Sequence, residues 1–403
     1  MTILPIVVIE QSAFPRKEPK PEGRPAHHCN DTQSLFVNPW ESFGEFMTPG
    51  IRNSKDTWAV LKEWKNSPAP SKEDYVKVAK PDWAATSDRD TWAQDIKATW
   101  LGHACFLVEL PAPRDSKISQ DIETPARGPR ILFDPVFSNR CSPSQWIGPA
   151  RYTPPPMPLK ELPHVDLVIL SHNHYDHTDI ATLQHIYNTQ PKGSVHFMCA
   201  LGNQKWFESI GFDKQHVTEL DWWDSRDATI TLQTGASKST LTVTCLPCQH
   251  FSGRSLWDRF HTLWASWAVE QRPYVDDLPA LANKPISKIW FGGDTGLRSV
   301  PRGRKQEDMP ICPVFKQIGE RFGGFDLAFI PIGAFSPRFA LSPVHASPDD
   351  AVEMHLLVKS QRSIGMHWGC WVLSTEPFGQ DPQRLKQACV DRGVDTGEFS
   401  TLY

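Results

Sequence analysis

The densest group of reactive side chains lies in the segment Ser171-His-Asn-His-Tyr-Asp-His177, which follows the apolar run 166–170. Its four potential metal ligands are His172, His174, Asp176 and His177. His172 and His174 are two residues apart, so an extended loop would present both on the same side. Imidazole nitrogens with a carboxylate oxygen suit zinc and related first-row ions. We expect this segment to bind metal, because such closely packed titratable groups are costly unless a cation joins them.

Three more candidate ligands each follow an apolar run of their own. His250 follows 241–246, Asp294 follows 289–291 with two glycines between, and His367 follows 364–366. The ends of parallel strands meet at one rim of a sheet, where α/β enzymes place their sites. This shared placement predicts that the three join the first cluster; taken singly, each could instead be an ordinary loop residue.

Asp294 is the best candidate for a ligand shared by two metal ions. One site would then comprise His172, His174, His250 and Asp294, and the other Asp176, His177, His367 and Asp294. Two cations about 4 Å apart can activate a shared water and stabilise charge on the attacking and leaving oxygens. This layout fits hydrolysis of an anionic ester, particularly a phosphodiester. Asp134 ends another apolar run, and we expect it to orient a metal ligand, with turn capping as the alternative.

The elements that must position these residues alternate between strands and helices. Apolar runs predict strands at 104–110, 130–133, 166–170, 241–246, 286–291, 326–332 and 363–366. Helices are expected around 178–189, 202–210, 313–322 and 348–359. This order indicates a layered α/β domain. We divide the chain into a flexible N-terminal arm (1–35), a segment that packs on the main domain (36–95) and the hydrolase domain (96–403).

The overall composition excludes some classes of function. The chain has 403 residues, 39% of them hydrophobic, and a formal net charge of −4, so it lacks the basic excess of a nucleic-acid binder. Its 16 Trp suit either a core or an interfacial surface. The nine Cys indicate reduced thiols in an intracellular protein. For the pair Cys245 and Cys248 we favour a structural role over a redox one.

No apolar run approaches the roughly 18 residues that a membrane-spanning helix needs. Residues 11–30 carry Glu18, Glu22 and several Pro, unlike an acid-poor mitochondrial transit peptide. We therefore expect an intracellular protein whose contact with membranes, cytoplasmic or mitochondrial, is peripheral.

Several short motifs around the ligand pattern resemble one known family. The pattern H-x-H-x-D-H with a later His, Asp and His is that of the metallo-β-lactamase superfamily. Within it, the motifs from about residue 36 to about residue 375 resemble the N-acylphosphatidylethanolamine-hydrolysing phospholipases D. They are Phe36-Val-Asn-Pro-Trp40, Thr99-Trp-Leu-Gly-His103, Asp134-Pro-Val-Phe-Ser138, Ser142-Pro-Ser-Gln-Trp-Ile-Gly-Pro149, Glu219-Leu-Asp-Trp-Trp223, Gly292-Gly-Asp-Thr-Gly296 and His367-Trp-Gly369.

The resemblance implies a four-layer αββα fold with an N-terminal extension, two zinc ions on the seven ligands, and cleavage of N-acylphosphatidylethanolamine into N-acylethanolamine and phosphatidic acid. It implies substrate contacts from Tyr175, His345 and Gln145, and a catalytic part for Asp176, Asp294 and His345. The leaving group could take its proton from solvent or from Asp176. Family members bind membranes peripherally and can form homodimers.

The chain departs from the family pattern in two places, and two alternative functions stay open. Added residues around 271–284 and an unmatched N-terminal arm leave acyl preference and membrane docking open, and Trp257, Phe260 and Trp264 could frame an acyl groove or belong to the core. The same fold also carries sugar-phosphate lactonases and nucleases. A metal-stabilised binding protein without turnover is the alternative from another class.

Overall fold

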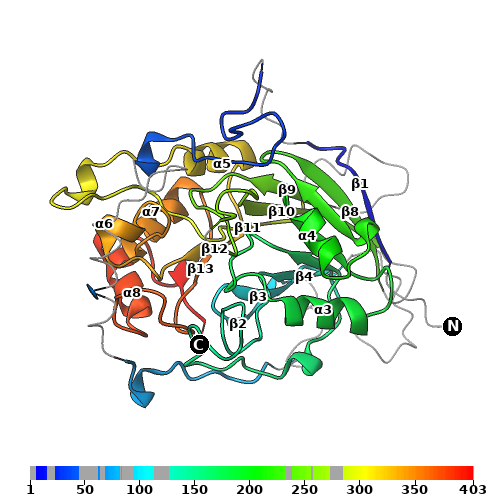
Figure 1. Cartoon of the computed structure of the whole chain (residues 1–403), viewed down its shortest axis with the longest axis horizontal. Helices are drawn as coiled ribbons and strands as arrows, with labels where there is room; N and C mark the ends of the chain where they lie inside the picture. Colours follow the sequence, from blue (N-terminus) through cyan, green and yellow to red (C-terminus); the bar gives the residue numbers. More distant parts are fainter. Residues whose placement is uncertain are drawn as a thin grey trace.

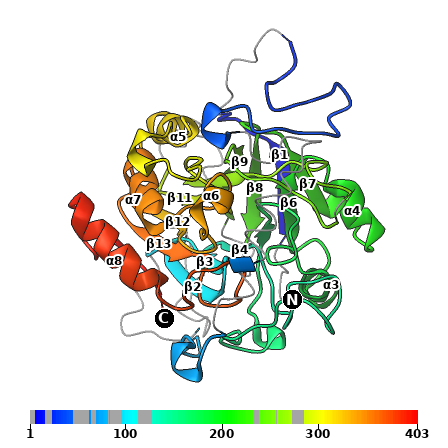
Figure 2. The ribbon, with the colours of Figure 1, turned by 60° about the vertical axis from the view of Figure 1, so that its left-hand side comes forward.

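The computed structural model describes residues 6–15, 23–44, 62–63, 69–81, 83, 95–112, 127–232, 238–255, 257–272 and 285–402. Two β-sheets lie face to face, and helices cover their outer faces (Figures 1 and 2). This is the four-layer αββα architecture that the family resemblance implies, and it includes the layered α/β order expected from the sequence pattern.

The six-stranded sheet has the order β2-β3-β4-β5-β6-β7. Its first three strands are antiparallel and the rest parallel. They are β2 (Lys97–Gly102), β3 (Cys105–Glu109), β4 (Arg130–Phe133), β5 (Leu167–Ile169), β6 (His196–Ala200) and β7 (Val217–Leu220). Helices α3 (Ile180–Thr189) and α4 (Gln204–Ser209) lie on its outer side. Leu183 and Ile186 of α3 are buried with Val168 and Phe197 of the sheet.

The eight-stranded sheet has the order β1-β8-β9-β10-β11-β12-β13-β14, antiparallel up to β11 and parallel from there. Its strands are β1 (Ile6–Gln11), β8 (Ser225–Thr231), β9 (Lys238–Leu246), β10 (Ser266–Arg272), β11 (Ser287–Phe291), β12 (Leu327–Pro331), β13 (Ser363–Met366) and β14 (Phe399–Ser400). Helices α5 (Val314–Phe322), α7 (Pro348–Leu357) and α8 (Asp381–Arg392) lie outside it, and the short α6 (Arg338–Leu341) precedes α7. Because both faces are covered, β12 is buried along its whole length.

Aromatic side chains fill the space between the two sheets. Phe133 of β4 stacks on Phe291 of β11, with ring centroids 4.5 Å apart, and Phe106 of β3 contacts Phe329 of β12 at 4.6 Å. One hydrophobic cluster joins both sheets through these residues. This packing fixes β4, β11 and β12 against one another, and hence the loops that follow them.

All the strands and helices expected from the sequence are present, with ends that differ by a few residues. The expected strands correspond to β3, β4, β5, β9, β11, β12 and β13, and the expected helices to α3, α4, α5 and α7. Helix α7 begins as its sequence indicates: the Ser347 side chain accepts from Asp350 N, and Pro348 lies in the first turn.

The N-terminal residues differ from the expected flexible arm over 1–35. Residues 6–11 form β1, which pairs with β8 from Ile6–Thr231 to Gln11–Arg226. The expectation was wrong there because Val7 and Ile9 share one face of the strand and pack against the core. Pairing also covers the edge of β8. Residues 1–5 and 16–22 of the arm, most of the predicted packing segment 36–95, and 273–284 of the added stretch lie outside the described residues.

Candidate metal centre

The loop between β5 and α3 carries the central cluster, and Asp134 holds its first residue. Asp134 follows β4, the strand beside β5, so both strands deliver their ends to the same rim. Its carboxylate accepts hydrogen bonds from Ser171 N (2.7 Å) and Ser171 Oγ (2.6 Å). The backbone of Asp134 has φ +40°, a strained value for a residue other than glycine. Such strain persists only where the surroundings impose it, which is common at functional sites.

His172, His174 and His250 form one group. His174 Nδ1 lies 2.8 Å from His172 Nε2 and 3.3 Å from His250 Nε2. The other ring nitrogen of His250, Nδ1, is 2.9 Å from the carbonyl oxygen of Val344, so it donates there and leaves the Nε2 lone pair facing the group. The three ligand atoms lie within 4.8 Å of one another, and the predicted first site is thus assembled in space.

Asp176, His177 and His367 form a second group. Asp176 Oδ2 lies 3.5 Å from His177 Nε2 and 3.4 Å from His367 Nε2. His177 Nδ1 is 2.7 Å from Asp134 Oδ2, so Asp134 fixes both the tautomer and the orientation of this imidazole. The expectation that Asp134 orients a candidate ligand is therefore confirmed as a contact. His367 has φ +63°, a second strained residue at the same site.

Asp294 lies between the two groups. Its Oδ2 atom is 3.1 Å from His177 Nε2, 3.0 Å from His367 Nε2, 3.7 Å from His250 Nε2 and 4.0 Å from His172 Nε2. Gly293, with φ +58°, lets the chain reach this position, because a Cβ there would stand 2.7 Å from the Cβ of Ser171. One carboxylate oxygen thus faces nitrogens of both groups.

Burial and mutual charge shift the pKa values of these residues in opposite directions. Burial, followed by the neighbouring imidazoles, lowers the pKa of His172 well below its usual value. Burial opposes charge on His367 too, but Asp294 and Asp176 together outweigh burial and raise the pKa of His367 to about 9. The imidazoles in turn hold the pKa of Asp176 and Asp294 well below the usual range despite burial. The carboxylates are therefore ionised and available as ligands.

Several buried polar atoms of the cluster have no hydrogen-bond partner among the described residues. Those that face the centre between the two groups include His177 Nε2, His367 Nε2 and Asp294 Oδ1. Unsatisfied buried polar groups are costly and call for a specific explanation. Divalent cations would satisfy all of them at once, since neutral imidazole nitrogens and carboxylate oxygens are their ordinary ligands. The donor set thus fits two metal ions, and all seven predicted ligands are brought together.

His103 belongs to the centre, although the sequence did not lead us to assign it a role. It lies in the turn between β2 and β3, with Nε2 3.1 Å from Asp176 Oδ2 and its ring centroid 4.0 Å from that of His367. The residue is buried and has φ +56°. Its place at a strand end, in the motif Thr99-Trp-Leu-Gly-His103, was the available signal.

Two of the three predicted substrate contacts border the cluster. His345 Nδ1 lies 3.9 Å from Asp294 Oδ2, and its ring stacks on that of His367. Tyr175 lies in the ligand loop itself, with the Arg254 guanidinium 3.9 Å from its ring centroid. Gln145, the third, is exposed. Its amide is occupied by its own loop, accepting from Arg140 N and donating to Arg140 O.

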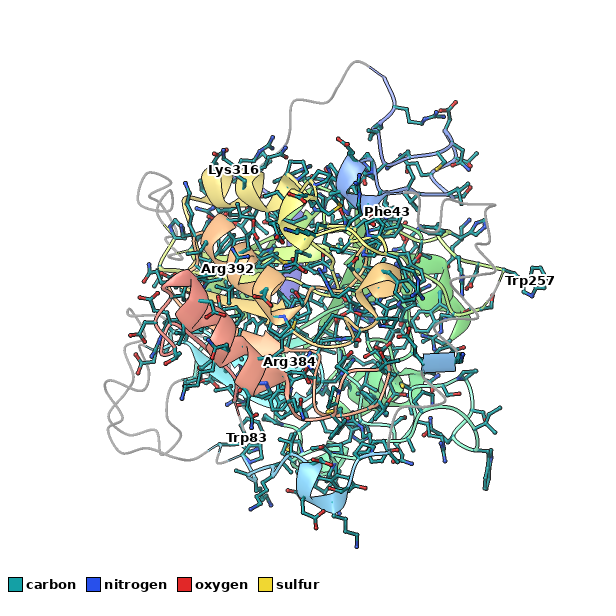
Figure 3. All side chains as sticks on the ribbon, turned by 90° about the vertical axis from the view of Figure 1, so that its left-hand side faces the viewer. Phe43, Trp83, Trp257, Lys316, Arg384 and Arg392 are labelled. Atoms are coloured by element: carbon teal, nitrogen blue, oxygen red, sulfur yellow. The ribbon has the colours of Figure 1, made fainter. Side chains whose placement is uncertain are left out.

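The aromatic residues that could have framed an acyl groove separate into two kinds. Phe260 and Trp264 are buried in the core. Trp257 is 86% exposed and projects from the edge of the molecule (Figure 3). Phe260 and Trp264 are thus core residues, and only Trp257 is available to an external partner.

The pair Cys245 and Cys248 has the properties of structural thiols. Both are free and buried, and burial raises their pKa well above the usual value. A reactive cysteine needs an accessible thiolate. The structural role favoured from the sequence is consistent with this.

Comparisons with known proteins lead to the same family that the sequence motifs resemble. A model of the beta-lactamase superfamily domain matches residues 129–368. The N-acyl-phosphatidylethanolamine-hydrolyzing phospholipase D 1 of Caenorhabditis elegans is 34% identical over 371 residues, covering 91% of this chain and 89% of that protein. The mitochondrial enzyme so named from Saccharomyces cerevisiae is 30% identical over 289 residues, covering 72% of this chain and 50% of that protein. The solved isothiocyanate hydrolase from Delia radicum gut bacteria is 14% identical with a TM-score of 0.48, covering 76% of this chain and 96% of that one.

Proposed function

Because this chain belongs to the N-acylphosphatidylethanolamine-hydrolysing phospholipase D family of the β-lactamase superfamily, we propose that it hydrolyses N-acylphosphatidylethanolamine to N-acylethanolamine and phosphatidic acid. The observation that carries the proposal is the position of Asp294. Its Oδ2 lies within 4.0 Å of nitrogens from both histidine groups, as a carboxylate shared by two cations requires.

The metal ions are two zinc ions in this proposal. His172, His174, His250 and Asp294 would hold one, and Asp176, His177, His367 and Asp294 would hold the other. When bound, the pair supplies charge neutralisation for the phosphodiester and lowers the pKa of a water molecule. His103 steadies Asp176 through its 3.1 Å contact, and Asp134 steadies His177.

The chemical step joins a water oxygen to phosphorus and breaks the bond from phosphorus to the oxygen of N-acylethanolamine. His345 and Tyr175 border the cluster and orient the phosphodiester there. The leaving oxygen takes its proton from solvent, because the neighbouring imidazoles hold the pKa of Asp176 well below the usual range and keep it ionised. Of the two proton sources left open by the sequence, this favours solvent.

The test is hydrolysis of N-acylphosphatidylethanolamine vesicles by the purified full chain in water enriched in heavy oxygen. We expect N-acylethanolamine and phosphatidic acid by mass spectrometry, with the heavy oxygen in phosphatidic acid, because attack is at phosphorus. Label in N-acylethanolamine would exclude that mechanism. Metal analysis of the same sample should give zinc.

The same experiment decides between the competing functions. Turnover of a soluble lactone or of nucleic acid, with intact phospholipid, would replace the proposal by another hydrolase of this fold. Bound metal with no hydrolysis of any of these substrates would favour a binding protein.

We further propose peripheral contact with the membrane through two loops. Trp146 and Ile147 are 89% and 70% exposed, and Trp257 is 86% exposed. Such apolar side chains are suited to a membrane interface. The Trp257 loop is tied to the ligand loop, since Arg254 Nη1 donates to the carbonyl oxygens of Asn173 (2.8 Å) and Thr178 (2.9 Å). No helix among the described residues has the length and apolar character to cross a bilayer.

Replacing Trp146 and Trp257 together by Ser tests this contact. Burying a large apolar side chain contributes about 1.5–3 kcal/mol, so the double variant should lose roughly tenfold or more in activity on vesicles. A soluble short-chain diester should be hydrolysed as before. The control is Val390→Ser, an exposed apolar position on α8. Equal losses on vesicles and on the soluble diester would show that the tryptophans act on the catalytic site instead.

The domain boundaries and the oligomeric state stay predictions. In this proposal residues 96–403 form the hydrolase domain and 36–95 pack on it, in keeping with the buried Phe36 and Phe43. Sedimentation analysis of the full chain would test the predicted homodimer.

A further inference from the structure

A second cluster of metal-ligating side chains lies outside the centre described above. We propose that His27, His28 and Asp221 form a separate site for zinc or a similar first-row cation, which anchors the N-terminal segment 24–42 to the hydrolase body. Asp221 follows β7, whereas the two histidines come from a part of the chain near the N-terminus. The proposal does not depend on which reaction the other centre catalyses.

The three side chains converge on one another. His27 Nε2 lies 2.7 Å from Asp221 Oδ1, with which it forms a hydrogen bond, and His28 Nε2 lies 2.9 Å from Asp221 Oδ2. All three ligand atoms lie within 4.8 Å of one another. His27 and His28 are 8% and 3% exposed. Two imidazoles from consecutive residues and one carboxylate make a ligand set typical of zinc.

The second observation is the state of His28 Nε2. This atom is buried and makes no hydrogen bond among the described residues, although Asp221 Oδ2 is only 2.9 Å away, because the approach is not directed along the ring N–H. The same signature marks the other centre, where His177 Nε2 and His367 Nε2 lie 3.1 Å and 3.0 Å from Asp294 without a hydrogen bond. If the carboxylate simply accepted a hydrogen bond from each imidazole, both ring nitrogens would be satisfied. A cation satisfies the nitrogen and the carboxylate together.

The surroundings allow a fourth ligand and hold the rings in place. A cavity of about 510 Å³ is lined by His27, Asp221, Trp40 and Trp222, among others, so water can reach the site. The ring of His27 stacks on that of Trp222 with centroids 4.2 Å apart. Three protein ligands with one position open to solvent is a common arrangement for zinc.

The segment held by this site also supports the other centre. Val37 N donates to the carbonyl oxygen of His27 (2.9 Å), and the next side chain, Asn38 Nδ2, donates to the carbonyl oxygen of His250 (2.7 Å). Further along, Ser42 Oγ donates to Gln249 Oε1 (2.6 Å). In Figures 1 and 2 the segment, in blue, runs on the same side of the molecule as α5, and Val314 and Gln317 of that helix line the same cavity. Anchoring at His27 and His28 thus fixes a chain segment that contacts the backbone of His250.

Zinc content of the purified full chain tests the proposal. We expect about three zinc ions per chain in the wild type, two at the centre around Asp294 and one here. His27→Gln combined with His28→Gln, and separately Asp221→Asn, should each lose about one. His185→Gln, on α3 and outside every described cluster, should keep all three. Wild-type zinc content in the double variant would overturn the proposal.

Hydrogen exchange on the wild type provides a measurement that does not rely on the variants folding. Zinc is added stepwise to metal-free protein, and exchange is followed in a peptide that spans 27–38. By the third equivalent, exchange should slow at the amides of Phe36 and Val37, which donate to Phe260 O and His27 O. The Asp294→Asn variant should show the same protection, since its anchoring site is intact. Unchanged exchange at every zinc level in both proteins would contradict the site, whereas loss of hydrolysis alone would bear only on the proposed function.

Discussion

Replacing Asp294 by Asn is expected to abolish turnover and to lower bound zinc. Asn has nearly the same size, but its oxygen carries no charge, so it cannot neutralise two cations at once. Asp294 Oδ2 faces His172, His177, His250 and His367, and no other carboxylate among the described residues faces both groups. We expect a loss on the order of 10³-fold or more in kcat on vesicles. Metal analysis should show about one zinc ion fewer per chain, or a greater loss.

The control for this variant is Asp326→Asn. Asp326 accepts from a backbone amide, Lys288 N at 2.7 Å, and it precedes β12 at the opposite end of the strand from the centre. Its replacement should leave both zinc and kcat at the wild-type level. Full activity in Asp294→Asn would remove the shared-ligand assignment. If activity is lost but the zinc content is unchanged, Asp294 is needed for hydrolysis but does not hold the two zinc ions.

Replacing Asp134 by Asn is expected to weaken the centre through His177 rather than through direct contact with metal. Asp134 is fully buried and accepts from Ser171 N, Ser171 Oγ and His177 Nδ1. The amide N–H of Asn would then face the N–H at His177 Nδ1, and two donors cannot form a hydrogen bond. The His177 proton would move to Nε2, the atom that faces Asp294. A loss of about 10- to 100-fold in zinc affinity is expected, since this is the usual effect of losing such a supporting contact.

Zinc affinity is measured by competition with a chelator, and kcat is measured at saturating zinc. Ser171→Ala is the comparison variant, because it removes the hydroxyl's contacts with Asp134 Oδ2 and His172 Nδ1 but leaves the His177 contact with Asp134 intact. It should retain most of the affinity. If Ser171→Ala and Asp134→Asn weaken zinc binding equally, then Asp134 acts by holding the loop, and the tautomer argument is wrong.

The sequence predicted much of the fold because its strands and helices have local signals. Apolar runs that end at turn residues identified β4, β5 and β13 to within a residue or two. β1 was missed because a short apolar run near a chain end resembles an arm until β8 is available to pair with it. Pairing depends on residues more than two hundred positions apart, which no local pattern reports.

The seven ligands could be named from the sequence for the same local reason. Each lies in the loop that follows a strand that local periodicity reveals, and strand ends gather at one rim. Gln145 and the His27–His28 pair had no comparable signal, and for His103 the signal was only its place in one short motif. His103 contacts Asp176 only because a turn of one sheet meets the loop of a neighbouring strand, and Gln145 bonds to its own loop. These facts depend on side-chain direction, which spacing does not specify.

The amino-acid sequence alone therefore determined the class of chemistry: which residues can bind metal, and that they follow strands of one layered domain. Only the tertiary structure decided that Asp294 lies between two histidine groups, that Phe260 and Trp264 are core while Trp257 is exposed, and that His28 meets Asp221. The physical reason is the distance along the chain over which each property is determined. Ligand type and strand propensity are properties of short segments, whereas distances of about 3 Å between distant residues follow from how the two sheets pack across their shared aromatic core.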